Sequence, residues 1–312
     1  MNHDGANWER DVIAKLASDA LAEQKRGRRW GIVFKVLTFS YLFILLFVGL
    51  GWLGQGVSNE TGEHTALVEL NGVIAADSEA NADDVNAGLK AAFEADGTQA
   101  VVLRINSPGG SPVQSAVINN EISRLRELHP DIPLYAVVED ICASGGYYVA
   151  VAADQIYVDR ASIVGSIGVL MNGFGFTGTM DKLGVERRLL TAGASKGFLD
   201  PFSPLNAADQ AHARSMLGEI HSQFIEAVRQ GRGERLKETE EIFSGLMWTG
   251  EKSVELGLTD ALGSVAYVAR EVVQAEKIVN YSRRENLAER LVRRFGATFG
   301  NALVQGLRPG LQ

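Results

Sequence analysis

The hydrophobic pattern changes first at residue 30. Residues 1–29 are polar and charged, whereas residues 30–53 are nearly all apolar and carry Lys35 as their only charged side chain. An apolar run of this length can cross the ~30 Å hydrocarbon core of a bilayer. The pattern therefore predicts an N-terminal segment over 1–29 and a transmembrane helix over 30–53.

The orientation of this helix follows from its flanking charges. Four lysines and arginines lie in residues 25–29, and after Lys35 the next is Lys90. The positive-inside rule predicts a cytoplasmic N-terminus, so for a bacterial chain the rest is periplasmic or otherwise extracytoplasmic, on a single-pass inner-membrane anchor. A cleaved signal peptide is the alternative, but it has a shorter apolar run nearer the N-terminus and a small-residue cleavage site.

After a polar linker over 54–64, short apolar runs alternate with amphipathic segments. Strands are expected at 66–74, 99–105, 134–138, 155–158 and 185–191, and helices at 83–95, 113–128, 147–153, 204–232, 240–243, 249–256 and 264–277. Strands that alternate with helices predict an α/β domain with a mainly parallel sheet. We place this domain at 65–280, followed by a basic amphipathic tail over 281–312.

Composition narrows the possible functions. The chain has 312 residues, 46% of them hydrophobic, and a net charge of −8, which argues against nucleic-acid binding. Its single cysteine, Cys142, excludes an intrachain disulfide and a cysteine-based zinc site. The five histidines lack metal-ligand spacing, so we expect no metal and no cofactor.

The candidate chemistry centres on Ser144. The segment 140–148, Asp-Ile-Cys-Ala-Ser-Gly-Gly-Tyr-Tyr, follows an apolar strand and precedes an alanine-rich helix. A serine in such a turn stands at a helix N-terminus, where backbone N–H groups and the helix dipole favour a developing negative charge. The alternative is a glycine-rich turn with an incidental serine, and this stretch alone leaves both open.

A serine nucleophile needs a base and an oxyanion hole. Lys196 follows a predicted strand among small and apolar residues, whereas none of the histidines lies in a turn of that kind. A lysine accepts a proton only in its neutral form, and the alternative for Lys196 is a surface-loop lysine. Segment 106–111 is a second strand end with two glycines before a helix, so the N–H groups of Gly110 and Gly145 are candidates for the oxyanion hole. A plain turn is the alternative.

Four motifs in order give the chain a family resemblance. They are Asn-Ser-Pro-Gly-Gly at 106–110, Cys-Ala-Ser-Gly-Gly-Tyr-Tyr at 142–148, Val-Gly-Ser-Ile-Gly-Val at 164–169, and Lys196. Together they resemble the signal peptide peptidase A family, in its short, single-copy form. The resemblance implies a ClpP/crotonase-like fold with repeated ββα-type units.

The resemblance also implies roles for individual residues. Ser144 resembles the nucleophile, Lys196 the general base and Ser166 the hydroxyl that orients the lysine, with Gly110 and Gly145 at the oxyanion hole. Ser111 departs from a third glycine common in the family, which leaves the detail of the oxyanion loop open. Family members assemble as rings or domes, and in the short form the lysine reaches the serine of a neighbouring protomer.

These observations predict a membrane-anchored serine endopeptidase with a Ser/Lys dyad. Its substrates would be cleaved signal peptides or other hydrophobic, membrane-released peptides. We expect a homo-oligomer that meets membrane lipid through the N-terminal anchor and binds no nucleic acid. Two alternatives remain, a crotonase-like acyl-CoA enzyme and a non-catalytic membrane scaffold of the same fold.

Overall fold

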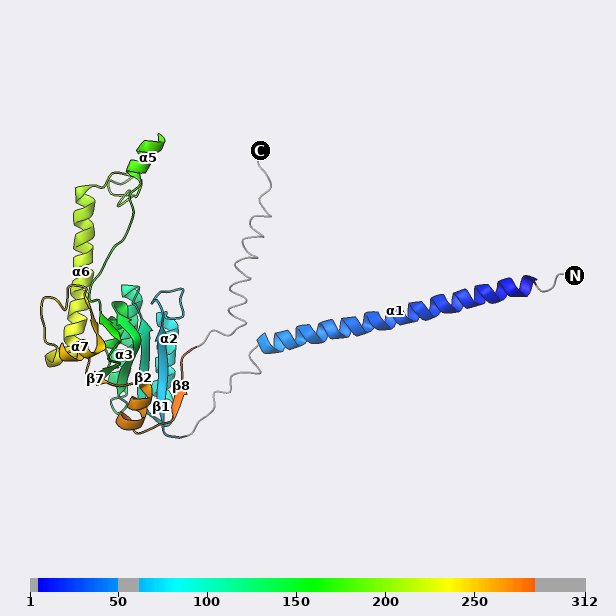
Figure 1. Ribbon diagram of the computed structural model, residues 1–312, viewed down its shortest axis with the longest axis horizontal. Helices are drawn as coiled ribbons and strands as arrows, with labels where there is room; N and C mark the ends of the chain where they lie inside the picture. Colours follow the sequence, from blue (N-terminus) through cyan, green and yellow to red (C-terminus); the bar gives the residue numbers. More distant parts are fainter. Residues whose placement is uncertain (1–4, 50–61, 284–312) are drawn as a thin grey trace. The chain divides into compact units, whose positions relative to one another are not determined.

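The computed structural model describes residues 5–49 and 62–283, which form two separate units. The first is a single helix and the second is the α/β domain (Figure 1). Most of the predicted linker and nearly all of the predicted basic tail lie outside the described residues.

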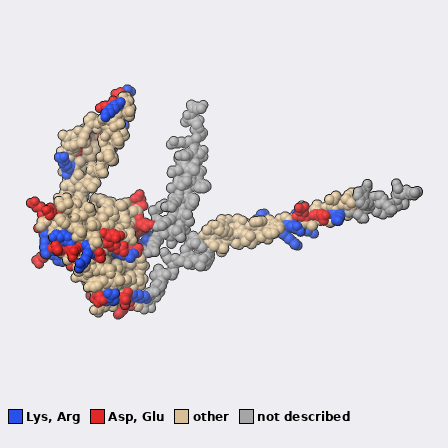
Figure 2. Space-filling model, viewed as in Figure 1, with Lys and Arg blue, Asp and Glu red and all other residues tan. Residues whose placement is uncertain are grey.

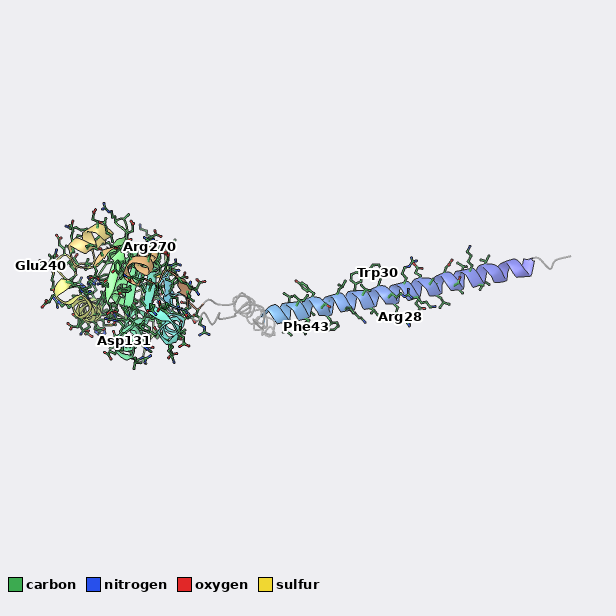
Figure 3. The ribbon with its side chains drawn as sticks, turned by 90° about the horizontal axis from the view of Figure 1, so that it is seen from below. Arg28, Trp30, Phe43, Asp131, Glu240 and Arg270 are labelled. Carbon is green, nitrogen blue, oxygen red and sulfur yellow. The ribbon has the colours of Figure 1, made fainter. Side chains whose placement is uncertain are left out.

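Helix α1 (Gly5–Gly49) runs without interruption through both the polar segment and the apolar run. Residues Val12–Leu46 contain a window long and apolar enough to cross a membrane. The side chains of Arg28, Trp30 and Phe43 project from this helix, as Figure 3 shows. The helix begins well before the apolar run because residues 5–29 contain no proline and many good helix formers.

The first half of the domain alternates strands and helices. Its elements are β1 (His64–Asn71), α2 (Ala82–Glu94), β2 (Thr98–Ser107), α3 (Pro112–Leu128), β3 (Leu134–Ala143), α4 (Gly145–Ala150), β4 (Gln155–Val158) and β5 (Ile163–Gly165). All of the strands and helices predicted between residues 66 and 158 are present, with shifted ends.

The second half contains more helix than strand. Its elements are α5 (Thr177–Leu183), α6 (Ala207–Arg232), the 3₁₀ turn η1 (Gly233–Arg235), β6 (Met247–Thr249), α7 (Gly250–Glu255), β7 (Ala261–Leu262), α8 (Val265–Tyr267), the π-helical turn η2 (Val268–Val272) and β8 (Ile278–Asn280). The long helix predicted at 204–232 is confirmed, and it begins after Asn206, whose side chain caps the first turn.

The eight strands form one sheet with the order β6-β5-β3-β2-β1-β8, and β4 and β7 continue from β3. All pairs are parallel except β5 with β6. Strand β3 has two neighbours on one side, because its first half pairs with β4 and its last three residues pair with β5. The predicted α/β class with a mainly parallel sheet is therefore confirmed, and the end of β3 is flanked by β2 and β5.

Both faces of the sheet are covered. Helices α2, α3 and α4 pack on one face over the main core, which includes Leu103, Ile118 and Tyr147. A smaller cluster around Val102, Val137 and Val268 lies apart from that core. Val102 and Val137 each lie between two strand residues that belong to the main core. Because successive strand residues point to opposite faces, burial on both faces explains the nearly continuous apolar runs of β1, β2 and β3.

Beyond the sheet, residues 169–206 and the N-terminal half of α6 form a projection, which we call the arm (Figure 1). The strand predicted at 185–191 is wrong, because this segment lies in the arm with exposed side chains and pairs with no strand of the described sheet. An apolar run becomes a strand only where a neighbouring strand takes its backbone hydrogen bonds.

Two other predicted helices differ from the structure. Residues 240–243 form turns instead of a helix, with Ile242 buried in the main core. The helix predicted at 264–277 ends at Val272, and Gln274 takes a positive φ of 61° that reverses the chain toward β8. Short apolar patterns report burial but do not specify the backbone conformation.

Candidate active site

Ser144 stands between β3 and α4 in a strained backbone conformation. Its φ is 51° and its ψ is −122°, a region that residues other than glycine rarely occupy. Its N–H donates to the carbonyl of Gly165 at 2.8 Å, and its own carbonyl accepts from Tyr148 N–H at 2.9 Å. The half-buried hydroxyl has no hydrogen-bond partner among the described residues, so it is available for reaction at a helix N-terminus.

Two glycine loops meet at this serine. A Cβ added to Gly109 would lie 2.6 Å from the nitrogen of Gly145 and 2.7 Å from Cβ of Ser144, and one added to Gly145 would lie 3.2 Å from the nitrogen of Gly110. No other residue type allows the two backbones to approach so closely. Within the described residues, the N–H groups of Gly110 and Gly145 donate to no acceptor, so two backbone donors without a partner lie close together at the turn that carries Ser144.

Hydrogen bonds within the loop and to the backbone of Ile74 hold the loop that carries Gly110. Ser107 Oγ accepts from Gly109 N–H at 3.1 Å, and the backbone of Ile74 binds Gly109 and Ser111 at 2.9 and 2.8 Å. The Ser111 side chain caps α3 by accepting from Gln114 N–H at 3.4 Å. A serine in place of the third glycine therefore serves as a helix cap here.

Ser166 is linked to Ser144 by way of Gly165, the residue that precedes Ser166 and that hydrogen-bonds to Ser144. Gly165, with φ 112°, accepts the N–H of Ser144, and Ser166 follows it with φ 52°. The N–H of Ser166 donates to the carbonyl of Leu246 at 2.8 Å. The fold thus brings Ser144, Ser166, Gly110 and Gly145 to one place, from segments that are far apart in the sequence.

Lys196 is placed differently. It lies in the arm, in the segment between α5 and α6. Its side chain is exposed, and its N–H donates to the carbonyl of Gly193 at 3.2 Å. A single chain in this conformation does not bring Lys196 to Ser144, so their pairing stays a prediction.

The histidines of the domain have ordinary packing roles. His129 stacks on Phe93 with ring centroids 5.5 Å apart, and His212 meets Phe198 edge-on at 5.6 Å. His221 comes nearest to the site, because its Nε2 lies 3.2 Å from the carbonyl of Ile167, the residue after Ser166. That carbonyl can only accept, so this nitrogen carries the proton.

The Cys142 thiol and the Tyr147 hydroxyl are buried near the Ser144 turn and remain protonated. Burial raises the pKa of the Cys142 thiol far above its ordinary value, so it remains protonated and unreactive. Burial likewise raises the pKa of Tyr147, whose hydroxyl donates to the carbonyl of Leu258 at 2.7 Å. Tyr147 therefore ties helix α4 to the loop before β7.

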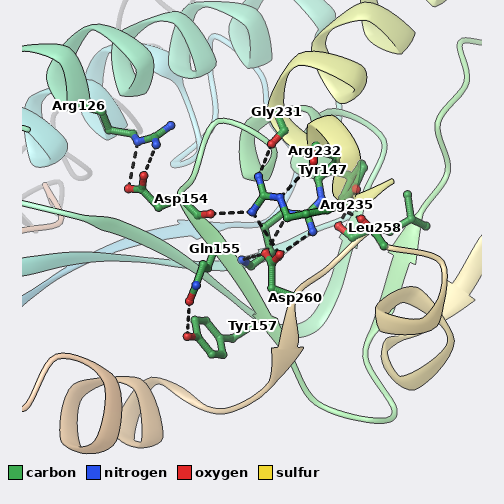
Figure 4. A network of polar contacts seen from close by, with 12 residues as sticks. Arg126, Tyr147, Asp154, Gln155, Tyr157, Gly231, Arg232, Arg235, Leu258 and Asp260 are labelled. Atoms are coloured by element: carbon green, nitrogen blue, oxygen red, sulfur yellow. Dashed lines mark hydrogen bonds and ion pairs between the residues drawn. The ribbon is translucent and has the colours of Figure 1, made fainter. Parts of the chain in front are cut away.

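Sequence reasoning missed the polar network that supports this loop (Figure 4). The Arg232 guanidinium is buried and binds Asp260 through two hydrogen bonds of 2.9 and 2.8 Å, and its Nε donates to the carbonyl of Gly257 at 2.9 Å. Arg235 adds a 3.2 Å hydrogen bond to the same carboxylate. No local sequence pattern identifies this pair, because its partners are 28 residues apart.

No group of histidine, cysteine, aspartate and glutamate side chains that could hold a metal ion occurs among the described residues. The site instead contains a hydroxyl and two backbone N–H groups that have no partner among the described residues. This arrangement can carry out nucleophilic attack on a carbonyl and stabilise the resulting oxyanion, once a base is supplied.

Comparison with known proteins agrees with this chemistry. Residues 126–279 match the family model described as Peptidase family S49. A candidate protease of Synechocystis sp. is 31% identical over 206 residues, which cover 65% of this chain and 71% of that protein.

A Brucella melitensis protein named Na(+)/H(+) antiporter NhaA is 46% identical over 177 residues, which cover 57% of this chain. This chain spans only 24% of that protein's length. A solved structure of a mutant 1510-N membrane-bound stomatin-specific protease with a substrate peptide is 14% identical, with a TM-score of 0.47 over 76% of this chain and 99% of that one.

Proposed function

Because this chain belongs to peptidase family S49, we propose that it is a serine endopeptidase in which Ser144 and Lys196 form a catalytic dyad. Ser144 Oγ attacks the scissile carbonyl while the neutral amine of Lys196 takes its proton, and the Ser166 hydroxyl orients that amine. The N–H groups of Gly110 and Gly145 stabilise the oxyanion. The leaving amine takes the proton, and water then hydrolyses the acyl-enzyme.

One observation carries this proposal. The Ser144 hydroxyl has no partner within the described chain, and the two unbonded N–H groups of Gly110 and Gly145 lie close together in the same turn. A turn that was only structural would not require a serine with φ 51°. Strain of this kind is typical of catalytic residues, where the surrounding packing holds the reactive group in place.

The base comes, in this proposal, from a neighbouring protomer. Lys196 lies in an arm whose surface is rich in exposed apolar side chains, among them Leu170, Phe174 and Leu190. Figure 2 shows few charges on the arm away from its tip, whereas charged side chains gather on the sheet domain. An apolar surface of this extent is normally covered by a partner, and a second copy of the chain would deliver Lys196 to Ser144.

The location of the substrate follows from the anchor. We place α1 across the bacterial inner membrane with the N-terminus in the cytoplasm and the catalytic domain outside. The substrates are then hydrophobic peptides released from the membrane, such as cleaved signal peptides. A reporter active only outside the cytoplasm, fused after Gln55, should be active, and activity of a cytoplasm-only reporter at that point would contradict the orientation.

A serine-reactive fluorophosphonate probe tests the activity. The full-length protein in detergent should be labelled at Ser144, and Ser144→Ala should abolish the labelling. An unlabelled wild-type protein would remove the peptidase assignment and favour the acyl-CoA enzyme or the scaffold. Hydrolysis of a hydrophobic fluorogenic peptide should disappear in the same variant.

A further inference from the structure

The backbone at the end of β5 connects both serines of the site to β6. Gly165 accepts the N–H of Ser144, and the next residue, Ser166, donates to the carbonyl of Leu246, which immediately precedes β6. Strands β5 and β6 are antiparallel, with Val164 opposite Trp248. The conformation of Gly165 and Ser166 therefore decides where the backbone of Ser144 lies.

This connection has to be held against strain. Ser144 and Ser166 have φ values of 51° and 52°, which are unfavourable for serine, and Gly165 has φ 112°. Such conformations persist only where the surrounding structure enforces them. The two backbone hydrogen bonds hold Gly165 to Ser144 and Ser166 to Leu246. A further contact is needed to keep Gly165 from moving away from the sheet into a less strained conformation.

The Trp248 ring lies directly against Gly165. A Cβ added to Gly165 would be 3.1 Å from Cδ1 and 3.6 Å from Nε1 of this ring, and 3.0 Å from the carbonyl oxygen of Leu246. The ring is partly buried and packs against the main core. Its buried N–H has no acceptor among the described residues, so packing rather than a hydrogen bond holds it in place.

We propose that Trp248 is a positioning residue, whose ring confines Gly165 and Ser166 and thereby sets the position of the Ser144 nucleophile. The proposal rests on the proposed function, because it assumes that Ser144 reacts. It explains why residue 165 is a glycine, since any side chain there would meet Trp248 and Leu246. It also gives a role to a strand of only three residues at the edge of the sheet.

The test compares Trp248→Ala with Trp248→Phe in the full-length protein. The rate of Ser144 labelling by a fluorophosphonate probe reports the nucleophile directly, and a hydrophobic fluorogenic peptide gives kcat and KM. Trp248→Ala should label about 100-fold more slowly, because a displacement of about 1 Å has an effect of that size. Its kcat should fall in parallel, while KM stays within about threefold of wild type.

Trp248→Phe keeps a flat aromatic ring, although a smaller one, and loses the N–H. It should restore labelling to within about tenfold of wild type, because the smaller ring still fills part of the space beside Gly165. Met247→Ala is the control, because Met247 is the preceding residue of β6 and its side chain is 55% exposed. It should stay within about twofold of wild type.

Three outcomes would overturn the proposal. Labelling of Trp248→Ala at the wild-type rate would show that the ring does not position Ser144. An effect confined to KM would assign Trp248 to substrate binding. Loss in Trp248→Phe as large as in Trp248→Ala would show that confinement by a flat aromatic ring does not position Ser144.

Two controls separate a failure of this proposal from misfolding of a variant and from a failure of the proposed peptidase function. Thermal unfolding is measured for each variant, and Trp248→Leu replaces Trp248→Ala if the latter does not fold, with the same loss of labelling and kcat expected. If the wild-type protein is not labelled at Ser144, the peptidase assignment fails. If the wild type is labelled and Trp248→Ala is labelled equally fast, only the positioning role fails.

Discussion

The turn at Ser144 and the arm that carries Lys196 are built in opposite ways. At the turn, Gly109 and Gly145 are so tightly enclosed that an added Cβ would meet backbone or serine atoms below 3.0 Å in the first case and the buried Ser115 hydroxyl in the second. In the arm, the side chains of Leu190 and Leu170 are 96% and 81% exposed. The turn that carries the proposed nucleophile is therefore fixed by contacts within the chain, whereas the proposed base lies on a largely exposed surface.

This difference has a consequence for catalysis. Contacts within the sheet domain hold Ser144 in place. In the proposed enzyme, the position of Lys196 would instead be set by the protomer that covers the arm. A base supplied by a neighbour would make activity depend on oligomerisation. The nucleophile would be formed early, and the enzyme would become competent only on assembly.

The largest effect expected is the loss of activity in Ser144→Ala and Lys196→Ala. Each should reduce peptide hydrolysis by about 10⁴-fold or more, and the double variant should be no worse, because the two residues act as one unit. If the lysine serves a neighbour, co-assembly of equal amounts of the two single variants should restore about a quarter of the sites. Hydrolysis of a fluorogenic peptide by the mixed oligomer measures this.

Two results of the mixing experiment would contradict a base supplied by a neighbouring protomer. A co-assembled but inactive mixture would place Lys196 in the same protomer as its serine, after a rearrangement of the arm. Substantial turnover by Lys196→Ala alone would show that another base is used. His221 would then be tested first, because it contacts the backbone beside Ser166.

The pH dependence separates a lysine base from a histidine base. Activity should rise with pH above about 7, because only the neutral amine accepts the serine proton. Lys196→Arg should be inactive throughout, since a guanidinium stays protonated. A profile whose midpoint lies near about pH 6.5 would indicate histidine instead, and initial rates across buffers of constant ionic strength decide between them.

Glycine-to-alanine substitutions should reduce activity far more in the enclosed turn at Ser144 than in the arm. Gly145→Ala forces a Cβ against the Ser115 hydroxyl and toward the nitrogen of Gly110, so hydrolysis should fall by about 100-fold or more. Gly178→Ala in the arm helix α5 is the matched control, because no atom lies within 4 Å of the added Cβ. Equal activity of the two variants would show that the turn is looser than its contacts indicate.

A smaller effect is expected beneath the turn. Tyr147→Phe removes the 2.7 Å hydrogen bond to the carbonyl of Leu258 and leaves that buried carbonyl without its side-chain donor. The free energy of unfolding should fall by about 1–3 kcal/mol in chemical denaturation. Tyr267→Phe is the control, because Tyr267 is 42% exposed. Its replacement should change the free energy of unfolding little. A stability equal to wild type in Tyr147→Phe would remove this link between α4 and β7.

The smallest effect concerns stability in acid. Burial by itself raises the pKa of Asp260, but its bonds and charge interactions with Arg232, the Ile156 N–H and Arg235 outweigh burial and lower it. A lowered pKa in the folded state means that the stabilisation is present at neutral pH and is lost as pH falls below the ordinary carboxyl range of about 4. Melting temperatures of wild type should fall more steeply there than those of Asp260→Asn, and parallel curves would contradict this.

Local chemistry was readable from the sequence because neighbouring residues determine it. A strand followed by Ser-Gly-Gly and an alanine-rich helix predicts the Ser144 turn, and the same reasoning finds the loop of Gly110. The apolar run in α1 likewise predicts a helix able to cross a membrane, because length and hydropathy are sums over adjacent residues.

Tertiary structure decided what depends on distant partners. Residues 185–191 have strand-like side chains but no neighbouring strand, so they stay irregular in the arm. The Arg232–Asp260 pair and the packing of Trp248 on Gly165 join residues far apart in the chain, and no local pattern encodes such contacts. Propensity and hydropathy act between neighbours along the backbone, whereas hydrogen-bond and packing partners are chosen only when the chain folds back on itself.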